Sequence, residues 1–261
     1  MPFTPSHAIV ALPFIRTPIP AGAVAVGAMA PDLPLFFPWV APYAVTHGFP
    51  GLLGVSLPLA VLLYAVWRLV IRPAASALLL PEALRARMPW AWDRVRRPER
   101  PVRSALLVVV AALIGVGTHA FWDLFTHPNR LGSEWFPVLG QQWGPVDGTT
   151  WLQHGFSALG LAGVAAWAVH ALRRAGVVHR SDPRSVAVVR VAAWISAGAL
   201  LVGSFAAHVA RDGFPGSYPQ LRDTAFDAGT IAGAAILVVT LAASILVRAV
   251  SIHRLRRHST H

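Results

Sequence analysis

The amino-acid sequence predicts an all-α, polytopic integral membrane protein with about five long transmembrane helices and a broken helical hairpin at its N-terminus. The chain of 261 residues is 55% hydrophobic and 13% charged, about half the charged share of a typical soluble domain. Five apolar runs are long enough to cross a bilayer, which requires about 20 residues of helix. The apolar composition also excludes an intrinsically disordered chain. The absence of cysteine excludes disulfides, thiolate metal sites and a cysteine nucleophile.

The first 46 residues differ from the rest of the chain. Ala8–Ile15 and Ala21–Met29 are apolar, but each is too short to cross a bilayer as a straight helix, and prolines lie in and between them. We expect residues 1–46 to form a broken helical hairpin or re-entrant segment, shielded by protein because unpaired backbone groups are costly in lipid. A cleaved signal peptide is the alternative, but no positive charge precedes the apolar run.

The remaining apolar runs are dominated by Ala, Val, Leu, Ile and Gly and carry almost no charge in their middle thirds. Soluble core helices rarely repeat this length five times in one chain, so we predict that each run crosses the membrane. The predicted spans are Leu52–Ile71, Ser104–Phe125, Leu152–Leu172, Ala187–His208 and Ala225–Val247.

The basic residues predict the orientation of these spans. All 22 are arginine, and 18 of them fall on one side of the membrane when the connections alternate. The positive-inside rule assigns this side to the cytoplasm, including a basic loop at residues 72–103 and a basic tail at 248–261. The connection at 127–150 is then extracytoplasmic, and a prokaryotic inner membrane is the expected location. Because topology accounts for the net charge of +11, we expect no nucleic-acid partner.

Within the basic loop, Pro81–Arg100 has two interpretations. It forms either a short amphipathic helix on the membrane surface, with Trp90 and Trp92 at headgroup depth, or a solvated basic loop.

Histidines and aspartates gather at the predicted outer ends of the helices. His119, Asp123 and His127 are spaced four residues apart, which places them on one helix face, and Pro128 marks the end of that helix. Two further candidates, His47 and His154, fall on the same side. His7 and Asp32 join them if the N-terminal segment is a hairpin. Taken singly, such a histidine is more often an interfacial polar residue, and Asp32 can simply cap a helix. Their convergence on one membrane face favours a functional site over these structural roles, because ionisable groups are costly near membrane helices.

These seven residues predict a metal site. Neutral imidazole and carboxylate suit Zn²⁺ and related divalent ions, so we expect one or two ions, with zinc as the first choice. Such an ion lowers the pKa of bound water and stabilises displacement at phosphorus. Asp32 and Asp123 are the candidate catalytic residues, which would orient water or bridge two ions.

Four sequence motifs resemble a known family. They are the opening Met-Pro-Phe-Thr-Pro-Ser-His, Met-Ala-Pro-Asp-Leu (29–33), Thr-His-Gly (46–48) and Gly-Thr-His-Ala-Phe-Trp-Asp (117–123). They resemble a bacterial membrane-protein family of unknown function, domain of unknown function 4184, along essentially the whole chain. That family is distantly similar to membrane-bound predicted metal-dependent hydrolases. The resemblance implies that His7, Asp32, His47, His119 and Asp123 correspond to the metal residues of those hydrolases, with Gly48 where they usually carry serine.

The sequence therefore leaves two alternative hypotheses about function. The first is a membrane-embedded metal-dependent hydrolase of a phosphoester or lipid headgroup, with membrane lipid as its partner. The alternative is a non-enzymatic protein, either a transporter or an assembly factor whose histidines bind metal. The absence of charge in the middle of the third to fifth spans disfavours ion transport.

Overall fold

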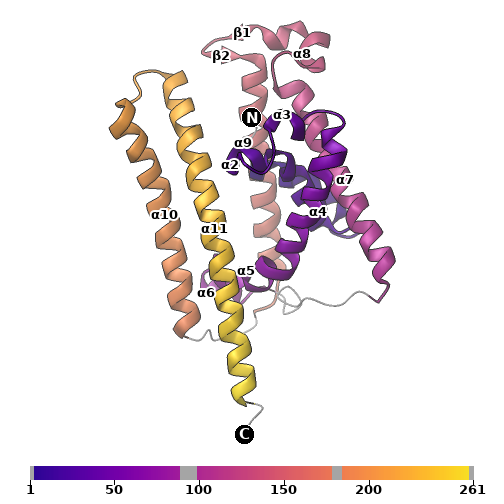
Figure 1. Cartoon of the computed structure of the whole chain (residues 1–261), viewed down its shortest axis with the longest axis vertical. Helices are drawn as coiled ribbons and strands as arrows, with labels where there is room; N and C mark the ends of the chain where they lie inside the picture. Colours follow the sequence, from indigo (N-terminus) through magenta and orange to yellow (C-terminus); the bar gives the residue numbers. More distant parts are fainter. Residues whose placement is uncertain (1–2, 89–98, 178–183, 259–261) are drawn as a thin grey trace. The chain divides into compact units, whose positions relative to one another are not determined.

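The computed structural model describes residues 3–88, 99–177 and 184–258, and side chains up to residue 250. Within these residues, five helices are long and apolar enough to cross a membrane, which confirms the predicted fold class. They are Leu52–Leu79, α7 (Pro101–Thr126), α9 (Gly148–Arg174), α10 (Arg184–Asp212) and α11 (Tyr218–His258) (Figure 1). Each helix extends beyond its predicted apolar run, and the last four do so at both ends.

The first long helix is built from four consecutive segments. These are η3 (Leu52–Ser56), α4 (Leu57–Val66), η4 (Trp67–Ile71) and α5 (Arg72–Leu79), of which η3 and η4 are wider π-helical turns. The helix therefore occupies the first eight residues of the expected basic loop at 72–103. Of the amphipathic helix expected over Pro81–Arg100, the structure contains the short α6 (Glu82–Arg85), while residues 89–98, including Trp90 and Trp92, lie outside the described residues.

The chain divides into two compact units, residues 1–65 with 96–173 and residues 66–95 with 174–261. In the second unit, α10 and α11 run side by side (Figure 1). Arg190 is buried and donates a hydrogen bond from Nη1 to the carbonyl oxygen of Ala77 at 3.2 Å, near the C-terminal end of α5. A cation is favourable there because the last carbonyls of a helix carry partial negative charge. The candidate site residues all belong to the first unit.

The N-terminal segment of the first unit is a chain of short helices. It contains η1 (Thr4–Phe14), α1 (Ala21–Met29), η2 (Ala30–Asp32), α2 (Leu33–Phe36) and α3 (Tyr43–Thr46). Prolines end or begin several of these helices, because proline has no N–H and restricts the residue before it. η1 packs against α1 after a turn at residues 15–20, so the predicted broken hairpin is confirmed.

Two glycines allow α1 to pack closely on α7. A Cβ atom on Gly27 would lie 2.5 Å from the carbonyl oxygen of Ala112, and one on Gly115 would overlap the carbonyl oxygen of Val24. Close approach through small residues is the usual packing of membrane helices. It brings α1, and the Pro31–Asp32 turn that follows it, against the face of α7 that carries His119.

A structured connection leads from α7 to α9, which is the last helix of the first unit. Residues 127–150 contain α8 (Leu131–Trp135), η6 (Pro137–Gly140) and a small antiparallel pair, β1 (Gln142–Trp143) with β2 (Val146–Asp147). Asp147 accepts hydrogen bonds from Thr149 and from the N–H of Thr150, which caps the start of α9. Further along, a Cβ on Gly160 would lie 2.7 Å from the Ser6 carbonyl oxygen, so η1 lies directly on α9.

Candidate metal centre

The candidate ligands come from four separate segments of the first unit. Helix α7 contributes His119 and Asp123 from its buried face, one turn apart. Asp32 ends η2, and His47 follows directly after α3. His7 comes from η1. All five side chains are buried, with His119 and Asp32 each 1% exposed.

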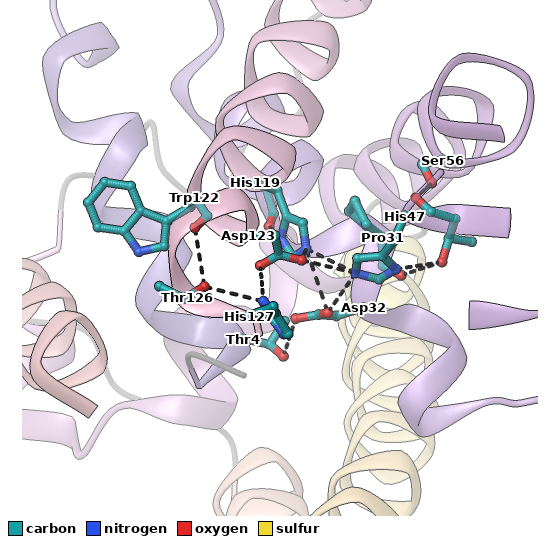
Figure 2. A network of polar contacts seen from close by, with 12 residues as sticks. Thr4, Pro31, Asp32, His47, Ser56, His119, Trp122, Asp123, Thr126 and His127 are labelled. Carbon is teal, nitrogen blue, oxygen red and sulfur yellow. Dashed lines mark hydrogen bonds and ion pairs between the residues drawn. The ribbon is translucent and has the colours of Figure 1, made fainter. Parts of the chain in front are cut away.

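Four of these side chains converge on one point (Figure 2). The Nε2 atoms of His47 and His119 are 3.1 Å apart. Asp32 Oδ1 lies 3.4 Å from His47 Nε2 and 3.7 Å from His119 Nε2. Asp123 Oδ2 lies 3.7 Å from His47 Nε2 and 3.4 Å from His119 Nε2. Two triangles of ligand atoms therefore share the edge between the two histidines.

The backbone determines which ring nitrogen faces this point. His119 Nδ1 lies 2.8 Å from the carbonyl oxygen of Ala28, and His47 Nδ1 lies 3.0 Å from that of Tyr43. A carbonyl oxygen only accepts hydrogen bonds, so Nδ1 carries the proton in each ring. In the neutral rings both Nε2 atoms then present lone pairs to each other. This arrangement is unfavourable unless a proton or a metal ion lies between the two nitrogens. A hydrogen bond from Nδ1 to a backbone carbonyl oxygen is also the usual second shell of a metal-binding histidine.

The carboxylates beside the two histidines also lack partners for their oxygens. Among the described residues, Asp32 Oδ1 and both oxygens of Asp123 are buried and have no hydrogen-bond partner. The Nε2 atoms of His7 and His127 are also buried and unpartnered. Unsatisfied buried polar atoms cost free energy, and carboxylate oxygens cost most. A divalent cation would satisfy these atoms together.

The spacing of these atoms fits a metal ion. Two ligands bound at about 2.0–2.2 Å to one ion lie roughly 2.8–3.6 Å apart, close to the separations found here. Two overlapping groups of candidate ligands have all their ligand atoms within 4.8 Å of one another. The first group contains His7, Asp32 and His119, and the second contains His47, His119 and Asp123.

His7 and His127 flank this centre in different ways. The ring centroid of His7 is 4.6 Å from that of His119, and burial, assisted by the nearby His119, lowers the pKa of His7 to about 4. His7 is therefore neutral at neutral pH, which is the form that binds metal. His127 Nδ1 lies 3.5 Å from Asp123 Oδ1, and burial lowers the pKa of His127 as well. His127 belongs to neither group of ligands but contacts the far oxygen of Asp123.

The structure does not bring the seventh candidate, His154, into this cluster. His154 is exposed on α9, whereas its neighbour Gln153 faces α7 and donates a hydrogen bond to the carbonyl oxygen of Thr126. Successive residues of a helix point about 100° apart, so only one of these two side chains can face α7. Proximity to the correct helix end therefore does not place His154 at the centre.

Several supporting residues were not predicted as site residues. Thr4 Oγ1 donates a hydrogen bond to Asp32 Oδ2 at 2.8 Å, which leaves Oδ1 directed at the histidines. Thr46 Oγ1 donates to the carbonyl oxygen of Pro31 at 2.9 Å, and Ser56 Oγ donates to the carbonyl oxygen of Thr46 at 2.8 Å. The Tyr43 ring stacks on His47 with centroids 3.8 Å apart. The one signal in the sequence was the position of Thr4 and Thr46 within two of the four family motifs.

The contact between Thr4 and Asp32 gives a specific prediction. Thr4→Val removes the hydroxyl that orients the carboxylate, and loss of such a partner typically weakens metal binding about 10-fold or more. Competition with a chelator of known affinity measures this change. Thr17→Val is the matched control, because the Thr17 hydroxyl bonds only within its own exposed turn. Wild-type metal affinity in Thr4→Val would contradict this role.

Comparison with known proteins links the chain to a family whose function is unknown. A sequence family described as a domain of unknown function (DUF4184) matches residues 1–250. No curated protein matches the chain, and no solved structure matches it.

Proposed function

The chain belongs to this family of unknown function, and we propose that it is a membrane-embedded, metal-dependent hydrolase of phosphoesters. The proposed ligands are His7, Asp32, His47, His119 and Asp123. The observation that carries the proposal is the 3.1 Å separation of two histidine nitrogens whose lone pairs face each other beside two unpartnered carboxylates.

The sharing of His119 favours a single ion at the centre. One Nε2 lone pair binds one ion, and His119 Nδ1 is occupied by the Ala28 carbonyl. We therefore propose one ion, shared by the two overlapping groups through His119. Three imidazoles and two carboxylates suit Zn²⁺ and also the neighbouring ions that accept higher coordination, so zinc remains the first proposal.

The residues around the centre suit hydrolysis. A bound divalent ion supplies Lewis acidity and lowers the pKa of water so that it becomes a nucleophile near neutral pH. The carboxylates of Asp32 and Asp123 accept hydrogen bonds, so they can orient the attacking water. The neutral ring of His127, whose Nδ1 faces Asp123 Oδ1, can accept a proton and return it to the leaving group.

The proposed setting is the extracytoplasmic face of a prokaryotic inner membrane. The orientation rests on the positive-inside rule, which assigns the arginine-rich connections to the cytoplasm. His119 and Asp123 lie in the last two turns of α7, directly before the connection at 127–150 that is expected outside. The centre therefore belongs near that surface of the bilayer, within reach of headgroups.

Exposed aromatic side chains support a substrate that comes from the membrane. Trp39 is 79% exposed and lies on the connection before α3, and Phe49 is 81% exposed and lies on the connection after α3, which also carries His47. Aromatic side chains at such positions typically sit at the level of the headgroups. We therefore propose a phosphoester, and in particular a lipid headgroup, as the substrate.

The test is hydrolysis by the purified protein in detergent. Chelator-treated protein should be inactive towards chromogenic phosphomonoesters and phosphodiesters, and one equivalent of Zn²⁺ or Mn²⁺ should restore cleavage of at least one of them. Asp123→Asn should remain inactive after the same treatment. Metal binding without cleavage of either these probes or phospholipid vesicles would favour the non-enzymatic alternative and overturn the proposed activity.

A further inference from the structure

Three arginines lie on the predicted extracytoplasmic side, and they differ in their partners. Arg211 pairs with Asp212 at 2.7 Å, and Arg222 pairs with Asp223 at 2.8 Å. Both pairs are exposed and join adjacent residues. Arg130 has no such neighbour, and within the described part of the chain no carboxylate pairs with its guanidinium. Its charge therefore remains available to a ligand.

The backbone of Arg130 is held in the short turn between α7 and α8. Arg130 follows His127 by three residues and precedes α8. The turn between them includes Asn129, which has a positive φ of 58°. Ser133 Oγ accepts a hydrogen bond from the Arg130 N–H at 3.1 Å and donates one to the Arg130 carbonyl oxygen at 2.8 Å. The residue is half-buried, so its side chain does not extend freely into solvent.

Arg130 lies in the turn that follows the helix of the candidate ligands. α7 carries His119 and Asp123 and ends at Thr126, four residues before Arg130. His127, between them, has its Nδ1 atom 3.5 Å from Asp123 Oδ1. The backbone therefore brings the Arg130 side chain to the same end of α7 as the cluster.

We infer that Arg130 binds the phosphate oxygens of the substrate, which makes it a specificity-determining residue of the proposed hydrolase. This inference rests on the proposed function. The two carboxylates balance the charge of one divalent ion, so Arg130 supplies the excess positive charge that selects an anion. Its planar fork donates two parallel hydrogen bonds to a phosphate, which lysine cannot reproduce.

The experiment measures binding of inorganic phosphate to the full-length protein in detergent, with and without added metal, and therefore does not depend on turnover. Arg130→Gln should weaken phosphate binding about 10- to 100-fold. Its metal content should remain that of the wild type. Arg130→Lys should recover part of the affinity. Arg211→Gln and Arg222→Gln are matched controls and should bind phosphate like the wild type.

Competition then distinguishes the source of the phosphoester. Displacement of phosphate by phosphatidic acid vesicles, and not by phosphatidylcholine vesicles or glycerol phosphate, would assign a lipid headgroup. Displacement by glycerol phosphate would assign a water-soluble phosphoester, and either result supports the role of Arg130. Equal phosphate affinity in wild type and Arg130→Gln, or no displacement by either phosphoester, would overturn it. Absence of metal from the wild type would instead count against the proposed function.

Discussion

Replacing His119 by alanine is expected to abolish metal binding and hydrolytic activity together. His119 is common to both groups of candidate ligands and is 1% exposed, so its replacement removes a buried ligand from each group. Removal also takes away one of the two histidines that lie beside the carboxylates of Asp32 and Asp123. Elemental analysis should find less than about one tenth of the wild-type metal, and phosphoester cleavage should fall at least about 100-fold.

His154→Ala is the matched control for this loss. It removes a histidine from the same predicted membrane face, but one that is exposed on α9. The metal content and activity of His154→Ala should equal those of the wild type. Full metal occupancy in His119→Ala, or loss of metal in both variants, would contradict the assignment of the centre.

The second large effect is expected from Gly115→Val. A Cβ at this position would overlap the carbonyl oxygen of Val24 and would lie 2.6 Å from the backbone nitrogen of Ala28. Backbone atoms cannot move aside as a flexible side chain can, so α1 must separate from α7. Overpacking of this kind typically costs about 1–3 kcal/mol or more. The carbonyl oxygen of Ala28 would also withdraw from His119 Nδ1, so metal affinity should fall with stability.

Thermal unfolding in detergent measures this effect, and Gly117→Val provides the control. Gly117 lies two residues further along the same helix, is exposed, and has open space where a Cβ atom would lie. Valine at 117 should leave the unfolding temperature within a few degrees of the wild-type value. If the Gly115→Val protein unfolds at the wild-type temperature and retains metal, the close packing of α1 on α7 is not what supports the centre.

Most of the fold follows from composition and periodicity. Long apolar runs predict membrane helices because the bilayer imposes a minimum length, and all five runs fall within observed helices. The predicted run Ala21–Met29 coincides with α1, since Pro20 precedes it and Pro31 follows closely. Exact helix ends could not be predicted, because the polar residues that extend them carry no hydropathy signal.

The centre was predictable in part, and the reason differs between residues. His119 and Asp123 share a helix face, so their spacing alone places them together. His7, Asp32 and His47 come together because α1 packs on α7 through Gly27 and Gly115, which is a tertiary contact that helical spacing does not encode. His154 shows the opposite case, in which a residue at the correct helix end is exposed and belongs to neither group of candidate ligands.

The contact of Thr4 with Asp32 and the proposed role of Arg130 could not be predicted for a related reason. A hydroxyl that donates to a carboxylate 28 residues away leaves no periodic signal in the sequence. In the sequence, Arg130 is a single basic residue on a side that is poor in arginine. Its proposed role depends on the lack of an adjacent aspartate such as those that pair with Arg211 and Arg222.

The most direct test of the central claim is the metal content of wild-type protein purified without chelators. We predict about one divalent ion per chain in the wild type, zinc first, retained by His154→Ala and lost from His119→Ala and Asp123→Asn. A wild-type protein that carries no stoichiometric zinc, manganese or iron, and takes up none when these ions are supplied, would contradict the presence of a metal centre.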